Sequence, residues 1–515
     1  MSSAILLGGP PSALVVQLYR SGNYVLGAKT KQAFVSVITW GLYNVYFHPL
    51  SRYPGPKLWA AYRVPYVIRN IQGVLPFKVL EFHKRYGPVV RIAPDELAYV
   101  DSEAWNDIYG LQPGRVQNAK DKYAYTPLQP GWDSNIIHAN DAMHARLRRI
   151  YGPAFTPKAV EEQSEMLVKY ADLLVTQLKN AIKQNPIQDL SAWYNFTTFD
   201  LTGDFAFGEA FHCLDRGGQY HFFVKTVFDG VSTGLRMMQL EHYYLLTLLK
   251  PLIPKSAMKP KMDMDQYTKE LVDRRVERGF LPDTVDVFNY LLHNKNPEDQ
   301  LTKPELYENG ITLVVAGSET TATLLTGTTY FLCKNPDALR EVQQEVRTNF
   351  KHDEDITPKA VNDLQYMLAV LSEAMRVYPP TGFGIPRLIS SKGGQMVAGG
   401  HVPEKTRCSV FHHAAYRYKN NFTRPEEFIP ERWLADTPPE FRDDKRDVLQ
   451  PFMVGPRGCL GKSLAYAEMR LLLAKMLWHF DFELADGEDD WYAGLKAFMV
   501  WDRGSLKVRL TPVKR

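Results

Sequence analysis

Near the C-terminus the chain reads FMVGPRGCLG from Phe452 to Gly461, which places Cys459 between two glycines and two residues after Arg457. Residues 462–480 follow with apolar side chains at helical spacing, and this spacing predicts an amphipathic helix. The backbone N–H groups and the dipole at the start of such a helix favour negative charge nearby. We therefore expect the pKa of the Cys459 thiol to lie below about 8.5, so that the thiolate, the form that binds metal ions, prevails.

Every fixed position of the pattern Phe-x-x-Gly-x-Arg-x-Cys-x-Gly is filled in this stretch. It resembles the haem-ligand loop of the cytochrome P450 family. The resemblance implies that Cys459 is the axial ligand of a haem iron, that Phe452 packs near the sulfur, and that Arg457 pairs with a haem propionate. Gly455 and Gly461 would let the backbone approach the porphyrin closely. The alternative is a buried cysteine in an ordinary turn.

The composition describes an ordinary globular protein: of 515 residues, 45% are hydrophobic and 23% are charged. The chain contains neither a low-complexity linker nor an internal repeat, so we expect one large domain after an N-terminal leader. The net charge of +4 does not favour binding to nucleic acid. The four cysteines lack the spacing of a metal site or a disulfide framework, which suits a reducing compartment.

The N-terminal leader holds two apolar stretches, residues 13–19 and 33–47, before the helix-breaking run Tyr53-Pro54-Gly55-Pro56. Both are shorter than the roughly 20 residues that span a bilayer, but Trp40, Tyr43 and Tyr46 suit its headgroup region. In the cytochrome P450 family such a hinge separates a membrane anchor from the catalytic domain. The resemblance implies an anchor in residues 1–56, a haem-binding monooxygenase domain in 57–515, and a cytosol-facing place on the endoplasmic reticulum membrane. Alternatively, both stretches pack on the domain.

A long, mostly apolar pattern over residues 304–335 predicts a buried helix, with Ala316-Gly317-Ser318-Glu319-Thr320-Thr321 at its middle. A glycine and a carboxylate in a buried helix both cost stability, and sequences break such local rules mainly at functional sites. The run resembles the oxygen-binding motif of the family. The resemblance implies that Ala316 and Gly317 border the cofactor, that Gly317 leaves room for dioxygen beside the haem, that Glu319 relays protons, and that Thr320 holds a water network. The alternative is a Ser/Thr cluster that bends the helix.

Two further places match propionate contacts of the family. His144 and Arg148 lie four residues apart on one face of a helix predicted over residues 141–151. They resemble an aromatic-x-x-x-Arg pair in which many members have tryptophan where this chain has histidine. Arg387, which follows an extended run after Pro379-Pro380, matches another such position. The alternative for the helix is an exposed basic face.

Glu373 and Arg376 share a face of a helix predicted over residues 364–377, and Arg432 stands in Pro430-Glu431-Arg432. The resemblance implies a buried Glu–Arg–Arg cluster that locks the fold behind the cysteine loop. The alternative is a surface salt bridge worth about 0–1 kcal/mol.

The remaining predictions concern strands and the substrate side. Residues 89–94 and 96–100 predict a β-hairpin, and 494–500 with 506–510 predict a second one around Asp502-Arg503-Gly504. By resemblance, the irregular segment 114–137 caps the substrate pocket. Five residues are candidates for substrate contact: Tyr123, Tyr125, Trp132, Phe498 and Met499. For each of them the alternative is ordinary packing.

Together these features predict a mainly α-helical fold with small β-sheets, the cytochrome P450 fold, with haem b between the central helix and the helix after Cys459. The resemblance implies a monooxygenase that inserts one oxygen atom of O2 into a hydrophobic small molecule. Because no flavin- or nicotinamide-binding pattern is evident, electrons would come from NADPH through a separate cytochrome P450 reductase, with cytochrome b5 as a second candidate donor. Residues 46–50 before the Pro/Gly hinge look like fungal members that build secondary metabolites, mycotoxins among them. The competing functions are an isomerase or dehydratase that acts on a peroxide, and a haem-based sensor without turnover.

Overall fold

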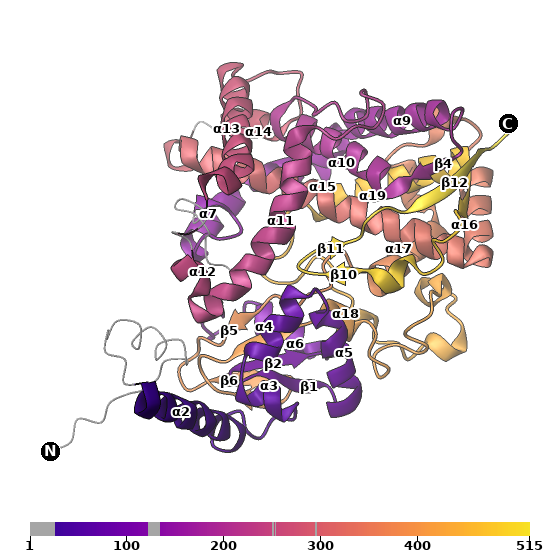
Figure 1. The fold of residues 1–515 in the computed structure, drawn as a ribbon. Coiled ribbons are helices and arrows are strands. Elements are labelled where there is room, and N and C mark those ends of the chain that lie inside the picture. The colour runs from indigo at the N-terminus through magenta and orange to yellow at the C-terminus, as the bar shows by residue number, and fades with distance from the viewer. Residues whose placement is uncertain (1–25, 122–133, 250–251, 253, 294–295, 515) are drawn as a thin grey trace.

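The computed structural model describes residues 26–121, 134–249, 252, 254–293 and 296–514. Helices dominate these residues, and small sheets lie at two sides of the helical body (Figure 1). The first of the longer helices are α2 Leu26–Tyr46, α4 Val64–Ile71, α5 Leu75–Tyr86, α6 Glu103–Tyr109, α7 Asp141–Tyr151, α8 Pro157–Glu162, α9 Ser164–Ala181 and α10 Leu190–Phe207. Those that follow are α11 Phe222–Leu240, α13 Lys255–Glu277, α14 Val287–His293, α15 Lys303–Lys334, α16 Pro336–Asn349, α17 Gln365–Val377 and α19 Lys462–His479. The short helices are α3 Lys57–Ala61, α12 Leu245–Leu249 and α18 His412–Ala415.

Twelve strands form four sheets within the described residues. They are β1 Val89–Ala93, β2 Glu96–Tyr99, β3 Ala119–Lys120, β4 Ile187–Asp189, β5 Arg387–Leu388, β6 Gln395–Val397, β7 Gly400–Val402, β8 Arg407–Val410, β9 Phe480–Leu484, β10 Lys496–Ala497, β11 Trp501–Asp502 and β12 Lys507–Pro512. The largest sheet has the order β1-β2-β8-β5-β3, and a three-stranded sheet has the order β4-β12-β9. β6 pairs with β7, and β10 pairs with β11.

The helix α15 runs through the middle of the molecule, as the apolar pattern predicts (Figure 1). A capping box between Thr302 and Glu305 begins it, since each side chain bonds the backbone N–H of the other residue. Packed against it are α10, α13, α17 and α19. A larger apolar core surrounds these helices, and a smaller one lies under the N-terminal sheet. The helix α15 is therefore the element around which much of the helical body packs.

The second apolar stretch of the leader falls in α2, whereas residues 13–19 lie outside the described residues. Several apolar side chains of α2 and the residues after it are exposed, among them Phe34 at 68% and Phe47 at 76%. Asn44 is buried and donates to the carbonyl of Ala61, so the end of α2 is fixed to α3. In the described part of the chain, none of the helices has both the length and the apolar character needed to cross a bilayer.

The first hairpin prediction is confirmed and the second is wrong. β1 and β2 pair antiparallel across Pro94-Asp95. Near the C-terminus, however, β10 pairs with β11 around residues 498–500, and β12 pairs with β9 and β4 instead. The turn at Asp502-Arg503-Gly504 thus leads from one sheet to another. The physical reason is that β12 alternates buried and exposed side chains and covers the core beside β9, where its apolar side chains are removed from water.

Candidate functional site

The cysteine loop is a tight turn closed by its own backbone. The N–H of Cys459 donates to the carbonyl of Phe452 at 2.8 Å, and the N–H of Gly458 donates to that of Gly455 at 2.9 Å. Gly455 has φ +77°, and a Cβ there would lie 2.1 Å from the carbonyl oxygen of Tyr109. Gly455 is therefore required by its left-handed backbone and by the contact with the end of α6. Gly461 is different, because a Cβ there would meet only Phe155, at an ordinary 3.9 Å.

The Cys459 side chain is accessible, and it lies just before the N-terminus of α19. Burial by the surrounding protein nevertheless raises the pKa of the thiol above its ordinary value. The N–H of Gly461 and the charges of Arg148 and Lys462 act in the opposite direction. The expected lowering of the pKa is thus wrong for the free thiol: the donors are present as predicted, but removal of water outweighs them. The ring of Phe452 packs beside the loop at 4.9 Å from that of Tyr466 on α19.

Arg457 points away from solvent into a set of basic side chains. One of its nitrogens, Nη2, donates to the carbonyl of Ala139 at 2.9 Å and to Asp141 at 2.7 Å. Its other two nitrogens, Nε and Nη1, are buried and have no hydrogen-bond partner among the residues that the structure describes. Two unsatisfied guanidinium donors in a buried position favour binding of a carboxylate group.

Four more basic side chains gather around Arg457. Burial and the charges of Arg457 and Arg387 lower the pKa of Lys120, on β3, to about 6. Burial and the charges of Arg457, Lys120 and Arg148 lower the pKa of His144 to about 4. We call Lys120, His144, Arg148, Arg387 and Arg457 the basic cluster. The positive charges of the cluster repel one another, and a bound anion would reduce that repulsion.

The basic cluster combines predicted and unpredicted residues. His144, Arg148, Arg387 and Arg457 are brought together as the motifs predict, although Arg148 also donates to the carbonyl of Gly458 at 2.6 Å and so supports the cysteine loop itself. Lys120 was missed by sequence reasoning, because a lone lysine in an irregular segment carries no motif. The three aromatic candidates of that segment, Tyr123, Tyr125 and Trp132, lie outside the described residues.

The middle turn of α15 has one accessible and one buried side. Ala316 is exposed and Thr320 is partly accessible, whereas Ser318 and Glu319 are buried. The hydroxyl of Thr320 donates to the carbonyl of Ala316 at 2.9 Å. A Cβ on Gly317 would lie 3.0 Å from Thr202, so this glycine allows the close approach of α10. Its role in making room for dioxygen stays a prediction.

Glu319 lies on the buried side and pairs with Arg503, a residue for which the sequence pattern predicts only a place in a hairpin turn. Burial raises the pKa of Glu319, and Arg503 opposes that rise. A second carboxyl group, Glu468 on α19, is also buried, and burial raises its pKa to about 8 although it hydrogen-bonds Thr321 on α15. The central turn therefore carries one buried acid, Glu319, which pairs with a cation, and contacts a second buried acid, Glu468, through Thr321.

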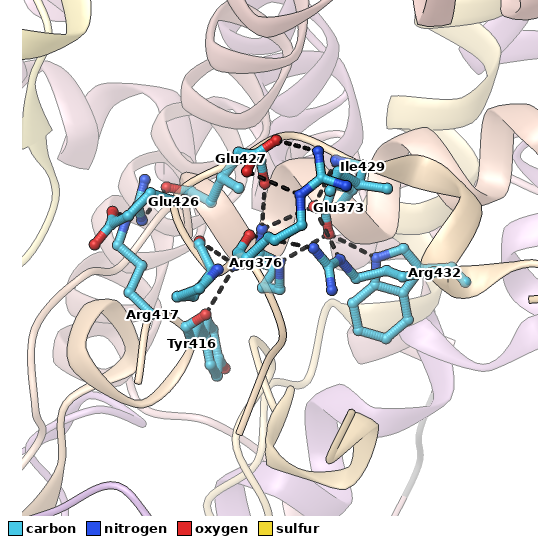
Figure 2. A network of polar contacts seen from close by, with 12 residues as sticks. Glu373, Arg376, Tyr416, Arg417, Glu426, Glu427, Ile429 and Arg432 are labelled. Atoms are coloured by element: carbon cyan, nitrogen blue, oxygen red, sulfur yellow. Dashed lines mark hydrogen bonds and ion pairs between the residues drawn. The ribbon is translucent and has the colours of Figure 1, made fainter. Parts of the chain in front are cut away.

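Figure 2 shows the Glu–Arg–Arg cluster and the polar contacts around it. Glu373, Arg376 and Arg432 are fully buried. Arg376 binds Glu373 through two parallel hydrogen bonds of 2.8 Å, and Arg432 reaches the same carboxylate at 3.2 Å. Although burial alone would raise the pKa of Glu373, the two guanidinium groups hold it below its ordinary value.

The same cluster binds the backbone of the segment that leads to the cysteine loop. Arg376 donates to the carbonyls of Tyr416, Pro425 and Glu427, and the N–H of Ile429 donates to Glu373. Arg432 adds an ion pair with Asp444. The arrangement excludes the surface salt bridge considered as the alternative and fits a structural lock.

Residues 54–500 match the family profile described as Cytochrome P450. The chain therefore belongs to the cytochrome P450 family, and its mainly helical architecture with small sheets is the fold of that family. Haem held by a cysteine thiolate is the cofactor that this membership implies.

Relatives with named activities come from fungi. The chain is 41% identical over 492 residues to the cytochrome P450 monooxygenase tpeC of Talaromyces stipitatus, with 93% of each chain covered. It is 38% identical to the trichothecene C-4 hydroxylase of Trichoderma arundinaceum, and the alignment covers 91% of this chain and 93% of the hydroxylase. It is 39% identical to the averantin hydroxylase of Dothistroma septosporum, with 92% and 89% covered. The protein is thus an oxidoreductase of the cytochrome P450 monooxygenase type.

Proposed function

We propose that this protein inserts one oxygen atom of O2 into a hydrophobic small molecule of fungal secondary metabolism, with Cys459 as the haem ligand. The observation that carries the proposal is the basic cluster beside an accessible thiol. Arg457 has two buried donors without partners in the described part of the chain, and burial together with the neighbouring cations lowers the pKa values of Lys120 and His144. A haem would fit both features: its iron would bind the Cys459 sulfur, and its two propionates would pair with the basic cluster.

When bound, a thiolate-ligated haem activates dioxygen, because the sulfur donates electron density that favours cleavage of the O–O bond. The protein residues then have separate tasks. Cys459 is the ligand, the basic cluster holds the propionates, and Phe452 shields one side of the sulfur. On the central turn, Thr320 orders water at the accessible side of α15, and Glu319 supplies protons from the buried side. Their hydroxyl and carboxylate are groups suited to moving protons at a buried site.

Electrons come from NADPH through a separate cytochrome P450 reductase, with cytochrome b5 as a second donor. The exposed ammonium of Lys462, at the start of α19 and three residues after Cys459, is a cation to which an acidic flavoprotein surface is attracted. The printed names of two relatives describe hydroxylases of a trichothecene and of averantin. Hydroxylation of a polycyclic or otherwise apolar metabolite, a mycotoxin precursor among the candidates, is the reaction that these relatives support.

Residues 1–56 attach the protein to the endoplasmic reticulum membrane, and residues 57–515 form the haem-binding domain on the cytosolic side. The exposed apolar side chains of α2 support this division, since isolated apolar residues are common on surfaces but a contiguous set marks an interaction site. Flotation with phosphatidylcholine vesicles tests it: the full chain should float, and the chain without residues 1–56 should float less. Equal flotation of both would contradict an anchor in the leader.

The test of the activity is reconstitution with a purified NADPH-dependent reductase, followed by untargeted comparison of metabolites from fungal strains with and without the gene. The proposal expects an oxygenated product that requires NADPH, O2 and the reductase. A product formed from a lipid hydroperoxide without reductase would support the isomerase or dehydratase instead. NADPH consumption without any product in the complete system would support a sensor.

A further inference from the structure

Glu319 is held by a guanidinium from near the end of the chain. Arg503 follows β11, and its Nη1 pairs with Oε1 of Glu319, 184 positions earlier in the sequence. The same nitrogen donates to the hydroxyl of Thr323, one helical turn further along α15, at 2.7 Å. Both members of the pair are buried, with Glu319 at 7% and Arg503 at 5% exposure. The acid of the central turn therefore faces the C-terminal segment rather than solvent.

Arg503 is itself fixed on a second helix. Its Nε donates to the hydroxyl of Ser191 at 3.1 Å, and its Nη2 donates to the side-chain oxygen of Asn195. Both partners lie on α10, four residues apart and thus on one face. All three nitrogens of the rigid, planar guanidinium are engaged, so its orientation is determined by α10 and α15 together.

The second carboxylate oxygen of Glu319, Oε2, forms no hydrogen bond with Arg503. Oε2 of Glu319 is buried and has no hydrogen-bond partner among the described residues. A buried carboxylate oxygen of this kind is an acceptor that water or a proton can satisfy. The two oxygens thus differ, since Oε1 is bound by Arg503 and Oε2 is free.

We propose that Arg503 is a positioning residue for proton transfer, which holds Glu319 by Oε1 and so presents Oε2 as the oxygen that takes up and releases the proton. This inference rests on the proposed function, in which Glu319 supplies protons. Arg503 also keeps the carboxylate able to lose its proton, because burial alone raises the pKa of Glu319 and the guanidinium opposes that rise. The other titratable groups that act on the pair are Asp502, Tyr220 and Tyr378.

The test uses the full haem-loaded chain with a purified NADPH-dependent reductase and O2, without added substrate. Under these conditions O2 is reduced and NADPH is oxidised, and the oxygen leaves as hydrogen peroxide or as water. Water requires twice as many electrons and protons per O2 as hydrogen peroxide does. The share of NADPH electrons recovered as hydrogen peroxide, and the change of that share in deuterium oxide, therefore report proton delivery rather than folding.

Four variants make the readout specific. They are Glu319→Gln, Arg503→Gln, Arg503→Lys and, as a matched control, Arg509→Gln on the same segment, whose side chain is half exposed and lies 3.9 Å from Glu483. The peroxide share of each variant is measured per unit of bound haem. A folding defect then lowers the amount of haem-loaded protein without altering the share of NADPH electrons recovered as peroxide. Arg503→Lys keeps the positive charge but loses the planar set of N–H donors of the guanidinium. This milder change still tests the inference if Arg503→Gln fails to fold.

The inference expects Glu319→Gln and Arg503→Gln to lower the rate of water formation by about a hundredfold, the low end of what a positioned proton donor contributes, and to raise the peroxide share. Arg503→Lys should give an intermediate value, and Arg509→Gln should match the parent protein. A fifth protein that combines Glu319→Gln with Arg503→Gln should behave like Glu319→Gln alone. If Glu319→Gln raises the peroxide share while both Arg503 variants leave it unchanged, the inference is overturned and the role of Glu319 stands. If Glu319→Gln itself changes nothing, the proposed proton supply by Glu319 fails, and the inference fails with it.

Discussion

Glu468, on the helix that follows the cysteine loop, hydrogen-bonds Thr321 on the central helix, next to Thr320. Glu468 is 3% exposed, and none of the described residues forms a hydrogen bond with its Oε1. Burial raises the pKa of Glu468, and the hydroxyl of Thr321 opposes that rise, whereas for Glu319 the opposing group is the cation Arg503. The contact joins α19, which begins three residues after the sulfur, to the turn that carries the proposed proton-handling groups.

Glu468 should make stability depend on pH in one direction. Burial raises its pKa from the ordinary 4.5 to about 8, so the folded protein binds a proton that the unfolded chain has lost in this range. The stability from this group is therefore complete below pH 4.5 and declines as the pH rises to about 8. In Glu468→Gln this decline should be absent, which thermal unfolding followed by haem absorbance at several pH values can measure. A parallel pH dependence of the variant and the parent protein would contradict the assignment.

Gly455 and Gly461 should respond differently to alanine. At Gly455 a Cβ would overlap the carbonyl oxygen of Tyr109, and a φ of +77° costs an L-residue roughly 1–2 kcal/mol besides. We expect Gly455→Ala to lose most of its haem. Gly461→Ala, with ordinary φ and an open contact, is the matched control and should retain haem. Haem content per protein decides the prediction, and equal retention in both variants would refute it.

The buried lock should matter for stability and not for the chemistry itself. Removal of one partner from a buried ion pair costs roughly 3–5 kcal/mol, so Glu373→Gln should unfold at a much lower temperature and bind haem poorly. The exposed pair Arg340 and Asp337 is the control, because such a pair contributes only about 0–1 kcal/mol. Thermal unfolding of Glu373→Gln and Asp337→Asn measures the contrast. Similar unfolding temperatures would mean that the cluster is dispensable.

Cys459→Ala should abolish thiolate ligation. The expected result is loss of the absorption band that thiolate-ligated haem gives when reduced under carbon monoxide, together with loss of haem. Cys333→Ala, in α15, removes a partly buried thiol for which burial raises the pKa to about 12, and it should leave that band unchanged. Persistence of the band in Cys459→Ala would assign the ligand to another residue.

Lys120 should contribute to haem retention although no motif contains it. Burial and two neighbouring arginines lower its pKa to about 6, and a bound propionate would restore the charged form. Lys120→Met keeps the aliphatic stem and should release haem to apomyoglobin faster than the parent protein. Lys225→Met provides a comparison away from the cluster. An unchanged release rate would remove Lys120 from the proposed propionate site.

The sequence by itself determined those parts of the protein that local pattern encodes. The cysteine loop, the capped central helix with its Gly-Ser-Glu-Thr turn, the β1–β2 hairpin and the Glu373–Arg376 spacing are each read within a few residues, because helix and strand periodicity and motif spacing are short-range properties. Family membership followed from the same local patterns.

Only the tertiary structure decided which distant residues share a site. Lys120 joins Arg457, and Arg503 joins Glu319, across more than a hundred intervening residues, and β12 leaves the predicted hairpin to pair with β9. The pKa of Cys459 was misjudged for the same reason. Nearby donors can be read from the sequence, but the loss of water around a sulfur depends on every element that packs against it.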